Sequence, residues 1–150
     1  MSVLAIAYIS ELAEGVAGDA IAQFVRRASA FNAQAGVTGI LLFDGTRFLQ
    51  YIEGPEDGVH AAYGRITGSK LHTKIIELGR ADVGRRFFPY WGMRMLPAQA
   101  EQLKAAMFHD WSSLEVRTTV PDGQLRGLEH VAQIVAPHIG AGAPHAALGI

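Results

Sequence analysis

The sequence predicts an α+β fold: a ferredoxin-like βαββαββ sheet with two helices on one face, followed by a C-terminal helical hairpin. Three observations support this prediction. Segments of strand and helix periodicity alternate over the first two thirds of the chain, the two predicted helices occupy similar positions in that repeat, and the pattern after Leu96 is wholly helical. With 150 residues, of which 49% are apolar, the chain can bury one domain core with a modest appendage.

The first strand and the first helix are predicted from their apolar patterns. From Val3 to Ser10 both alternating faces are mostly apolar, which is typical of a central strand covered on both sides. Asp19 is a candidate N-cap for the helix that follows, and Gly36 is expected to end it. The apolar stripe of this helix recurs every 3.6 residues and consists of Ile21, Phe24, Val25, Ala28 and Phe31.

The second unit of the repeat begins with a predicted hairpin. Residues Val37 to Phe43 are rich in β-branched and aromatic side chains, and Asp44-Gly45 is a turn signal that leads into a strand from Arg47 to Glu53. Gly54-Pro55 opens a second helix with acidic residues in its first turn. Two further strands are expected around Lys74 to Arg80 and around Tyr90 to Met95.

The C-terminal third is predicted to form two helices and a tail. The apolar stripe of the first helix is Leu103, Met107, Trp111 and Leu114. The stripe of the second helix is Leu125, Leu128, Ala132, Val135 and Ile139. We therefore expect a sheet domain over residues 1–97, a helical hairpin over residues 98–140 and a flexible tail over residues 141–150.

Composition argues against several classes of function. Lys and Arg number 13 against 14 Asp and Glu, and this formal net charge of −1 offers no electrostatic case for nucleic-acid binding. No apolar run approaches the ~18 residues of a membrane span, and the start, MSVLAIAYIS, lacks the features of a signal peptide, so we expect a cytoplasmic protein without a membrane partner. There is no cysteine and no HExxH spacing, so no metal site is predicted.

Three hydrogen-bonding side chains fall on faces that should be buried. Asn32 lies on the apolar side of the first helix, Gln50 alternates with apolar strand residues, and Tyr8 shares an apolar strand face. If these faces converge beneath the first helix, they form an apolar pocket with a few donors and acceptors, which is typical of a small-molecule site. Each residue also has a simpler interpretation as a satisfied core residue. One side of the last predicted strand carries Trp91, Met93 and Met95.

Four motifs in this order resemble those of the BLUF family. The first is a Tyr-x-Ser, Tyr8-Ile9-Ser10, and the second is an Asn followed by Thr-Gly, here Asn32 with Thr38-Gly39. The third is a Phe-Leu-Gln-x-x-Glu-Gly-Pro run from Phe48 to Pro55, and the fourth is Trp91-Gly92-Met93. They extend over about residues 3–97, and the helical C-terminal part is similar to that of short BLUF proteins without a fused effector domain.

The resemblance implies a photoreceptor that holds FAD non-covalently between the two helices and the sheet. By position, Asn32 would hydrogen-bond the C4 carbonyl and N3 side of the isoalloxazine ring. Gln50 would lie between the N5 and O4 edge of the ring and the Tyr8 hydroxyl, and Arg65 matches a family position near the ribityl or phosphate portion. The other residues that the resemblance assigns to the cofactor are Ser10, Phe31, Phe48 and His72.

The chain departs from the family pattern near the second helix. Where the family often has an Asp and then an Arg-His pair, this chain has Ser69, Leu71 and His72. Phe31 occupies a position at which the family frequently has Asn or His. These changes affect the adenine and phosphate end, so FMN and riboflavin are alternative ligands. They do not affect Tyr8, Asn32 or Gln50.

The mechanism that the resemblance implies is driven by blue light. An electron passes from Tyr8 to the flavin, a proton follows through Gln50, and recombination leaves the Gln50 amide rotated or tautomerised. The flavin ends oxidised, with a stronger hydrogen bond at O4 that shifts its absorption to the red. Trp91 and Met93 would relay the change to the helical hairpin, the candidate surface for a homo-oligomer or for an unidentified downstream protein, and no enzymatic activity is expected.

Two other classes of function compete with this interpretation. An acylphosphatase-like enzyme would need a phosphate cradle near the first strand, and none is found there; Thr67-Gly68-Ser69-Lys70 is only a weak match to a phosphate loop. In a flavin reductase, NADPH would bleach the visible absorption of the flavin, and light would not change the spectrum. An RNA-binding sheet would need exposed aromatic residues with basic surroundings, whereas this sheet is predicted to be covered.

Overall fold

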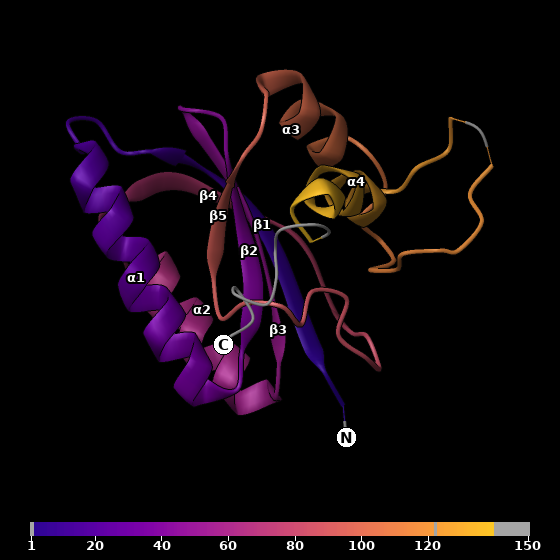
Figure 1. Cartoon of the computed structure of the whole chain (residues 1–150), viewed down its shortest axis with the longest axis horizontal. Coiled ribbons are helices and arrows are strands. Elements are labelled where there is room, and N and C mark those ends of the chain that lie inside the picture. The colour runs from indigo at the N-terminus through magenta and orange to yellow at the C-terminus, as the bar shows by residue number, and fades with distance from the viewer. Residues whose placement is uncertain (1, 122, 140–150) are drawn as a thin grey trace.

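The centre of the structure is a five-stranded sheet with the strand order β4-β1-β3-β2-β5 (Figure 1). It was obtained as a computed structural model that describes residues 2–121 and 123–139. Neighbouring strands are antiparallel except β2 and β5, which are parallel. The elements are β1 (Leu4–Leu12), α1 (Gly18–Ala35), β2 (Thr38–Phe43), β3 (Arg47–Gly54), α2 (Glu56–Thr67), β4 (His72–Asp82), β5 (Arg94–Pro97), α3 (Ala100–Met107) and α4 (Gly127–Ile139). This order confirms the predicted ferredoxin-like fold and its helical hairpin.

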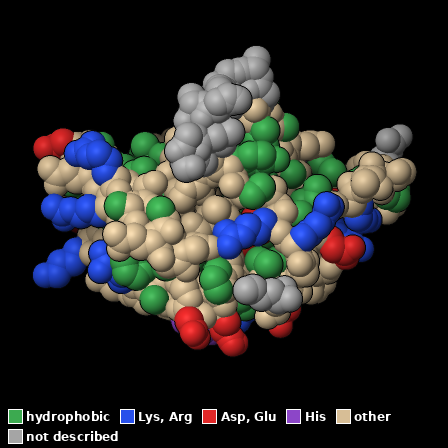
Figure 2. All heavy atoms as spheres, turned by 60° about the horizontal axis from the view of Figure 1, so that its bottom comes forward, with side chains coloured by type: hydrophobic (Ala, Val, Ile, Leu, Met, Phe, Trp, Pro, Cys, Tyr) green, Lys and Arg blue, Asp and Glu red, His purple; other side chains and the backbone are tan. Residues whose placement is uncertain are grey.

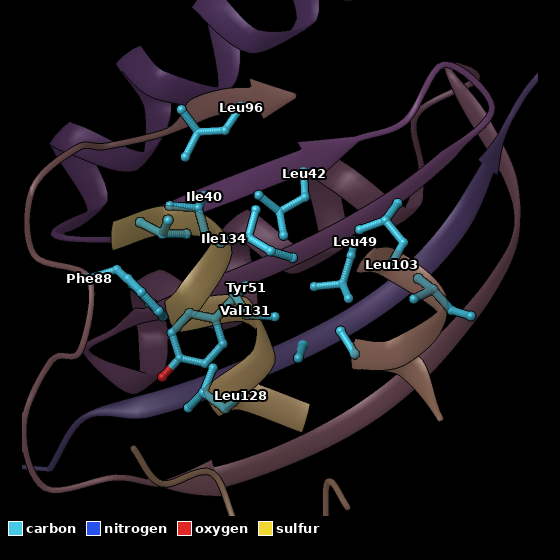
Figure 3. Packing of buried hydrophobic residues seen from close by; sticks show 14 of the residues in the cluster. Ile40, Leu42, Leu49, Tyr51, Phe88, Leu96, Leu103, Leu128, Val131 and Ile134 are labelled. Atoms are coloured by element: carbon cyan, nitrogen blue, oxygen red, sulfur yellow. The ribbon is translucent and has the colours of Figure 1, made fainter. Parts of the chain in front are cut away.

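The two helix pairs lie on opposite faces of the sheet (Figure 1). On the face covered by α1 and α2, the core includes Ile6, Ile21, Leu41, Ile52 and Val59. On the other face, the apolar sides of α3 and α4 pack on β2 and β3. Figure 3 shows Ile40 and Leu42 of β2 together with Leu103 of α3 and with Leu128, Val131 and Ile134 of α4. Both faces of the sheet are covered, which agrees with the prediction that β1, apolar on both sides, is a central strand.

The longest described helix, α1, begins earlier than the capping signal predicts. Its N-cap is Ala17, which makes no side-chain hydrogen bond, and Asp19 lies inside the first turn. The prediction of Asp19 as N-cap is therefore wrong, although a carboxylate in the first turn still interacts favourably with the helix dipole. Gly36 ends the helix as predicted, with φ of 76° and its N–H bonded to helix carbonyls. Within the described part of the chain, no helix combines the length and apolar character that a bilayer crossing requires.

The helices of the hairpin are shorter than their apolar stripes suggest. α3 ends at Met107, so Trp111 and Leu114 belong to the connecting segment and are still buried. The Trp111 indole donates to the Ala106 carbonyl at 2.8 Å and packs so closely on Gly127 that a Cβ there would overlap the ring. The prediction that one helix carries Trp111 and Leu114 is wrong. Their spacing matches a helical period, but a loop that folds back onto the core can bury residues at the same spacing.

The connection between α3 and α4 is tied to α4 through Glu129. The Arg117 guanidinium lies 2.6 Å from the Glu129 carboxylate, and the backbone N–H groups of Arg117 and Arg126 also donate to it. The hydrogen bonds from the Arg117 side chain lower the pKa of Glu129 to about 2. This buried carboxylate therefore stabilises the hairpin in its ionised form.

The last strand lies later in the chain than predicted. A strand was expected around Tyr90 to Met95, whereas β5 spans Arg94–Pro97 and the residues before it are irregular. Trp91 packs in the core beneath α3 and α4, and Met93 packs in the core beneath α1 and α2. The prediction that Trp91 and Met93 share one face is therefore wrong, because strand alternation does not hold in the turn that contains Gly92.

Candidate functional site

Tyr8 and Gln50 are paired directly across two central strands. β1 and β3 are antiparallel, and their register places Tyr8 opposite Gln50 on the face covered by α1 and α2. The Tyr8 hydroxyl donates to Gln50 Oε1, and Gln50 Nε2 donates to Met93 Sδ at 3.4 Å. All three side chains are buried. Since a thioether is a weak acceptor, the nitrogen end of the Gln50 amide is held less strongly than its oxygen end.

A second amide, Asn32, contacts the same segment from the last turn of α1. Asn32 Nδ2 donates to the Gly92 carbonyl at 2.9 Å. Gly92 lies so close to α1 that a Cβ there would be 2.8 Å from the Ser29 carbonyl, which explains the glycine. Both buried amides are therefore bonded to adjacent residues, Gly92 and Met93.

Ser10 and His72 form a separate polar pair beside Tyr8. His72 Nε2 lies 2.8 Å from the Ile66 carbonyl and Nδ1 lies 2.7 Å from the Ser10 hydroxyl. A carbonyl only accepts, so Nε2 carries the proton, and Nδ1 of a neutral ring accepts from Ser10. Burial lowers the pKa of His72 and so favours this neutral ring. The imidazole centre is 5.8 Å from the Tyr8 ring and 6.2 Å from the Phe48 ring.

A cavity of about 320 Å³ opens between α1 and α2. Its volume is at the lower end of the range of small-molecule sites, and its walls combine apolar side chains with an amide and cations. The Arg65 guanidinium lies over the Phe31 ring, 4.3 Å from its centre. The walls include Phe24, Arg27, Phe31, Asn32, Arg65 and Ile66.

Tyr8 is a neutral phenol in this setting. Burial, and secondly the charge of Tyr63, raise the pKa of Tyr8 well above its ordinary value. The phenol therefore keeps its proton at neutral pH. Its hydroxyl has one acceptor, Gln50 Oε1, and any proton that Tyr8 gives up would pass first to that atom.

The sequence-predicted residues form three groups in space, and Trp91 lies apart from them. Tyr8, Gln50 and Met93 form one hydrogen-bonded chain, and Asn32, Phe31 and Arg65 line the cavity. Ser10, Phe48 and His72 lie beside Tyr8 in the core and, like Tyr8, Gln50 and Met93, are not among the walls of that cavity. Trp91 is apart from all of these: its indole nitrogen is buried without a hydrogen-bond partner among the described residues, and the Arg94 guanidinium lies 4.8 Å from its ring centre.

Sequence reasoning missed a buried carboxylate, Glu53, on the opposite face of β3. Glu53 accepts the N–H groups of Phe87 and Phe88 at 2.9 and 2.6 Å, and the Tyr51 hydroxyl at 2.9 Å. Burial raises the pKa of Glu53 despite these donors. The available signal was a glutamate directly after the apolar pair Tyr51-Ile52, three residues after Gln50. Glu53 anchors the start of the segment that continues to Gly92 and Met93.

The comparison with protein families decides the class. The family model described as BLUF, sensors of blue-light using FAD, matches residues 3–94. The chain belongs to the BLUF family. The match includes all of β1 to β4, both helices beside the cavity and the first residue of β5. The chain is therefore a flavin-binding, blue-light-sensing photoreceptor, as the four motifs predict.

Relatives with BLUF domains support the assignment. The blue light- and temperature-regulated antirepressor BluF of Escherichia coli (strain K12) is 45% identical over 58 residues, which are 39% of this chain and 14% of that protein. The dark-state structure of the BLUF protein BlrB is 28% identical with a TM-score of 0.62, over 70% of this chain and 78% of that one. The structure titled BlrP1 BLUF, 22% identical, shares the fold over 99% of this chain and 86% of its own, with a TM-score of 0.61.

Proposed function

We propose that the chain binds FAD non-covalently in the cavity between α1 and α2 and signals light through the hydrogen bonds of Gln50. The observation that carries the proposal is the Tyr8 hydroxyl bonded to Gln50 Oε1 on the sheet face that α1 and α2 cover. When bound, the flavin supplies blue-light absorption and an excited state that accepts an electron. The residues present fit such a ring: aromatic and aliphatic walls, the Asn32 amide and the Arg65 cation.

In this proposal Tyr8 supplies the electron and Gln50 takes the proton. Removing an electron from a phenol makes its hydroxyl a strong acid, so the proton moves along the existing bond to Gln50 Oε1. Return of the electron and the proton restores neutral Tyr8. Gln50 can then remain in a different orientation or tautomer, because an amide has a donor end and an acceptor end that exchange places on rotation.

Rotation of Gln50 has consequences for Met93. The rotated amide would direct its oxygen toward Met93 Sδ, which cannot donate, so the present Gln50–Met93 contact would be lost. An unsatisfied buried group costs about 1–3 kcal/mol, enough to bias a packed segment between two arrangements. We propose that residues 91–93 respond to this change and that β5, which follows directly, transmits it.

The output surface in this proposal is the helical hairpin. β5 leads into α3, and Leu96 of β5 packs in the core beneath α3 and α4. A shift of β5 would therefore reach the hairpin, which we propose contacts a second copy of the chain or a downstream protein. We propose a division between a sensor sheet over residues 1–97 and this hairpin, whose predicted final residue, 140, and tail lie outside the described residues.

The test of the sensor class is the visible absorption spectrum of the purified protein before and after a blue flash. The proposal expects a flavin band that moves to the red, remains oxidised and returns in the dark. A colourless protein, or a flavin band that light does not move, would overturn it. Extraction of the bound flavin and its separation by chromatography would identify FAD, FMN or riboflavin.

A further inference from the structure

A second hollow continues the cavity along α1. It also measures about 320 Å³ and shares Phe24, Arg27 and Ser69 with the first. Its other walls include Ala20 of α1 and Lys70 of the segment between α2 and β4. Asn32, Ala28, Phe24 and Ala20 follow one another at intervals of four residues, so the joined hollows run along one side of α1 for about 18 Å.

The groove formed by these two hollows is positively charged at its distal end. Arg27 stands at the junction and Lys70 in the second hollow, and no acidic residue is among the walls of either hollow. Within residues 2–121 and 123–139, Arg27, Arg65 and Lys70 take part in no ion pair. Figure 2 shows Lys and Arg side chains gathered at the left of the molecule, the side that α1 occupies in Figure 1.

The turn that presents Lys70 is locally organised. The Ser69 hydroxyl accepts the Leu71 N–H at 3.1 Å, and the Ser69 N–H donates to the Ile66 carbonyl at 3.1 Å. Lys70 is exposed at the tip of this turn, beside the hollow. Leu71, which follows Lys70 and also lines the second hollow, is a buried apolar residue, so Lys70 is the cation that this turn contributes there.

We infer that Arg27 and Lys70 form a subsite for the diphosphate of FAD, and that this subsite makes the chain prefer FAD to riboflavin. The inference rests on the proposed function, which puts the isoalloxazine ring beside Asn32 in the first hollow. From there the ribityl chain leads along α1 toward Arg27, and the diphosphate meets both cations. Riboflavin has no phosphate and gains nothing from them, while the single phosphate of FMN engages Arg27 first.

The test is equilibrium dialysis of the flavin-loaded protein against FAD, FMN or riboflavin, with bound and free flavin quantified. Arg27→Gln and Lys70→Gln are each expected to weaken FAD binding about tenfold, the scale of one charge-assisted hydrogen bond, and to leave riboflavin binding within about twofold. The losses should shrink at high salt, because the cations are exposed. Arg26→Gln is the matched control: Arg26 is the exposed neighbour of Arg27 and lines neither hollow.

Each other outcome overturns the inference. Unchanged FAD affinity in both variants, an equal loss for riboflavin, or an equal loss in Arg26→Gln would show that no local diphosphate subsite exists. A wild-type chain that binds FAD no more tightly than riboflavin would also overturn it and leave the proposed photochemistry intact, because the photochemistry uses only the ring. A wild-type chain that binds no flavin would overturn both.

Discussion

Replacement of Glu53 by alanine should destabilise the protein and disturb the flavin site from the opposite face of the sheet. Glu53 is fully buried and accepts three hydrogen bonds, from the N–H groups of Phe87 and Phe88 and from the Tyr51 hydroxyl. Alanine leaves these three donors without that acceptor. At about 1 kcal/mol or more for each, we expect the free energy of unfolding to fall by about 3 kcal/mol, and the midpoint of thermal unfolding by about 6–12 °C.

The matched variants separate hydrogen bonding from charge. Glu53→Gln keeps one acceptor oxygen, which can serve Phe87 and Tyr51 together because both donate to the same carboxylate oxygen. Its free energy of unfolding should therefore lie between that of Glu53→Ala and that of the wild type. Glu14→Ala, an exposed glutamate in the loop before α1, is the control and should unfold like the wild type.

The pH dependence of stability gives an independent check on Glu53. Burial raises the pKa of Glu53 in the native state above that in the unfolded chain, so the native state holds this proton more tightly. The stabilising contribution of Glu53 is then complete below the unfolded pKa and declines as the pH rises through the native pKa. Glu53→Gln should lose this decline.

The assay is urea unfolding followed by far-UV circular dichroism and by flavin absorbance, at several pH values. Loosening of residues 87–93 should also weaken flavin binding in Glu53→Ala, because Gly92 and Met93 are the partners of Asn32 and Gln50. The reasoning is refuted if Glu53→Ala unfolds within about 0.5 kcal/mol of the wild type, or if Glu53→Gln is as unstable as Glu53→Ala.

Three further predictions follow from the site and the hairpin. Hydrogen bonds from Arg117 lower the pKa of Glu129 to about 2, so its stabilising contribution is present above the ordinary glutamate pKa and is lost as the pH falls toward 2. Acid unfolding of Glu129→Gln should lack this component, and an unchanged acid limb would contradict the argument. Asn32→Ala removes the bond to the Gly92 carbonyl and an amide from the cavity wall, so dialysis should show flavin affinity about tenfold lower; affinity equal to wild type would exclude Asn32 from the site. Met93→Leu preserves volume but removes the acceptor of Gln50 Nε2, which destabilises the dark orientation of the amide. Flash absorption should show slower dark recovery, and an unchanged recovery time would show that the sulfur contact does not matter.

The sequence predicts the fold and the central pair well, for physical reasons. Strand alternation places Tyr8 and Gln50 on buried faces, and the short connection Asp44-Gly45 fixes β2 against β3 as a hairpin. Helical periodicity places Asn32 on the buried side of α1, where it is 1% exposed. Such local patterns are reliable because each follows from the geometry of a single element.

Predictions failed where the chain leaves regular structure. Trp91 and Met93 precede β5 in a turn, so no period relates their directions, and Trp111 reaches the core from a loop whose spacing imitates a helix. Arg27 carries no sequence signal of a site, because an exposed cation on a helix is ordinary. Lys70 falls only in the weak phosphate-loop match Thr67-Gly68-Ser69-Lys70. Glu53 belongs to the run from Phe48 to Pro55, in which Gly54 and Pro55 were interpreted as the start of α2, and Glu53 itself was assigned no role.

The most direct test of the central claim is the blue-flash difference spectrum of Tyr8→Phe beside that of Tyr51→Phe. Tyr51 is equally buried but lies on the opposite face of β3, where it bonds to Glu53. We predict that Tyr8→Phe keeps its bound flavin and yellow colour but shows no red shift, while Tyr51→Phe shifts and recovers. A normal red shift in Tyr8→Phe would contradict the claim that Tyr8 and Gln50 convert light into a change of hydrogen bonds.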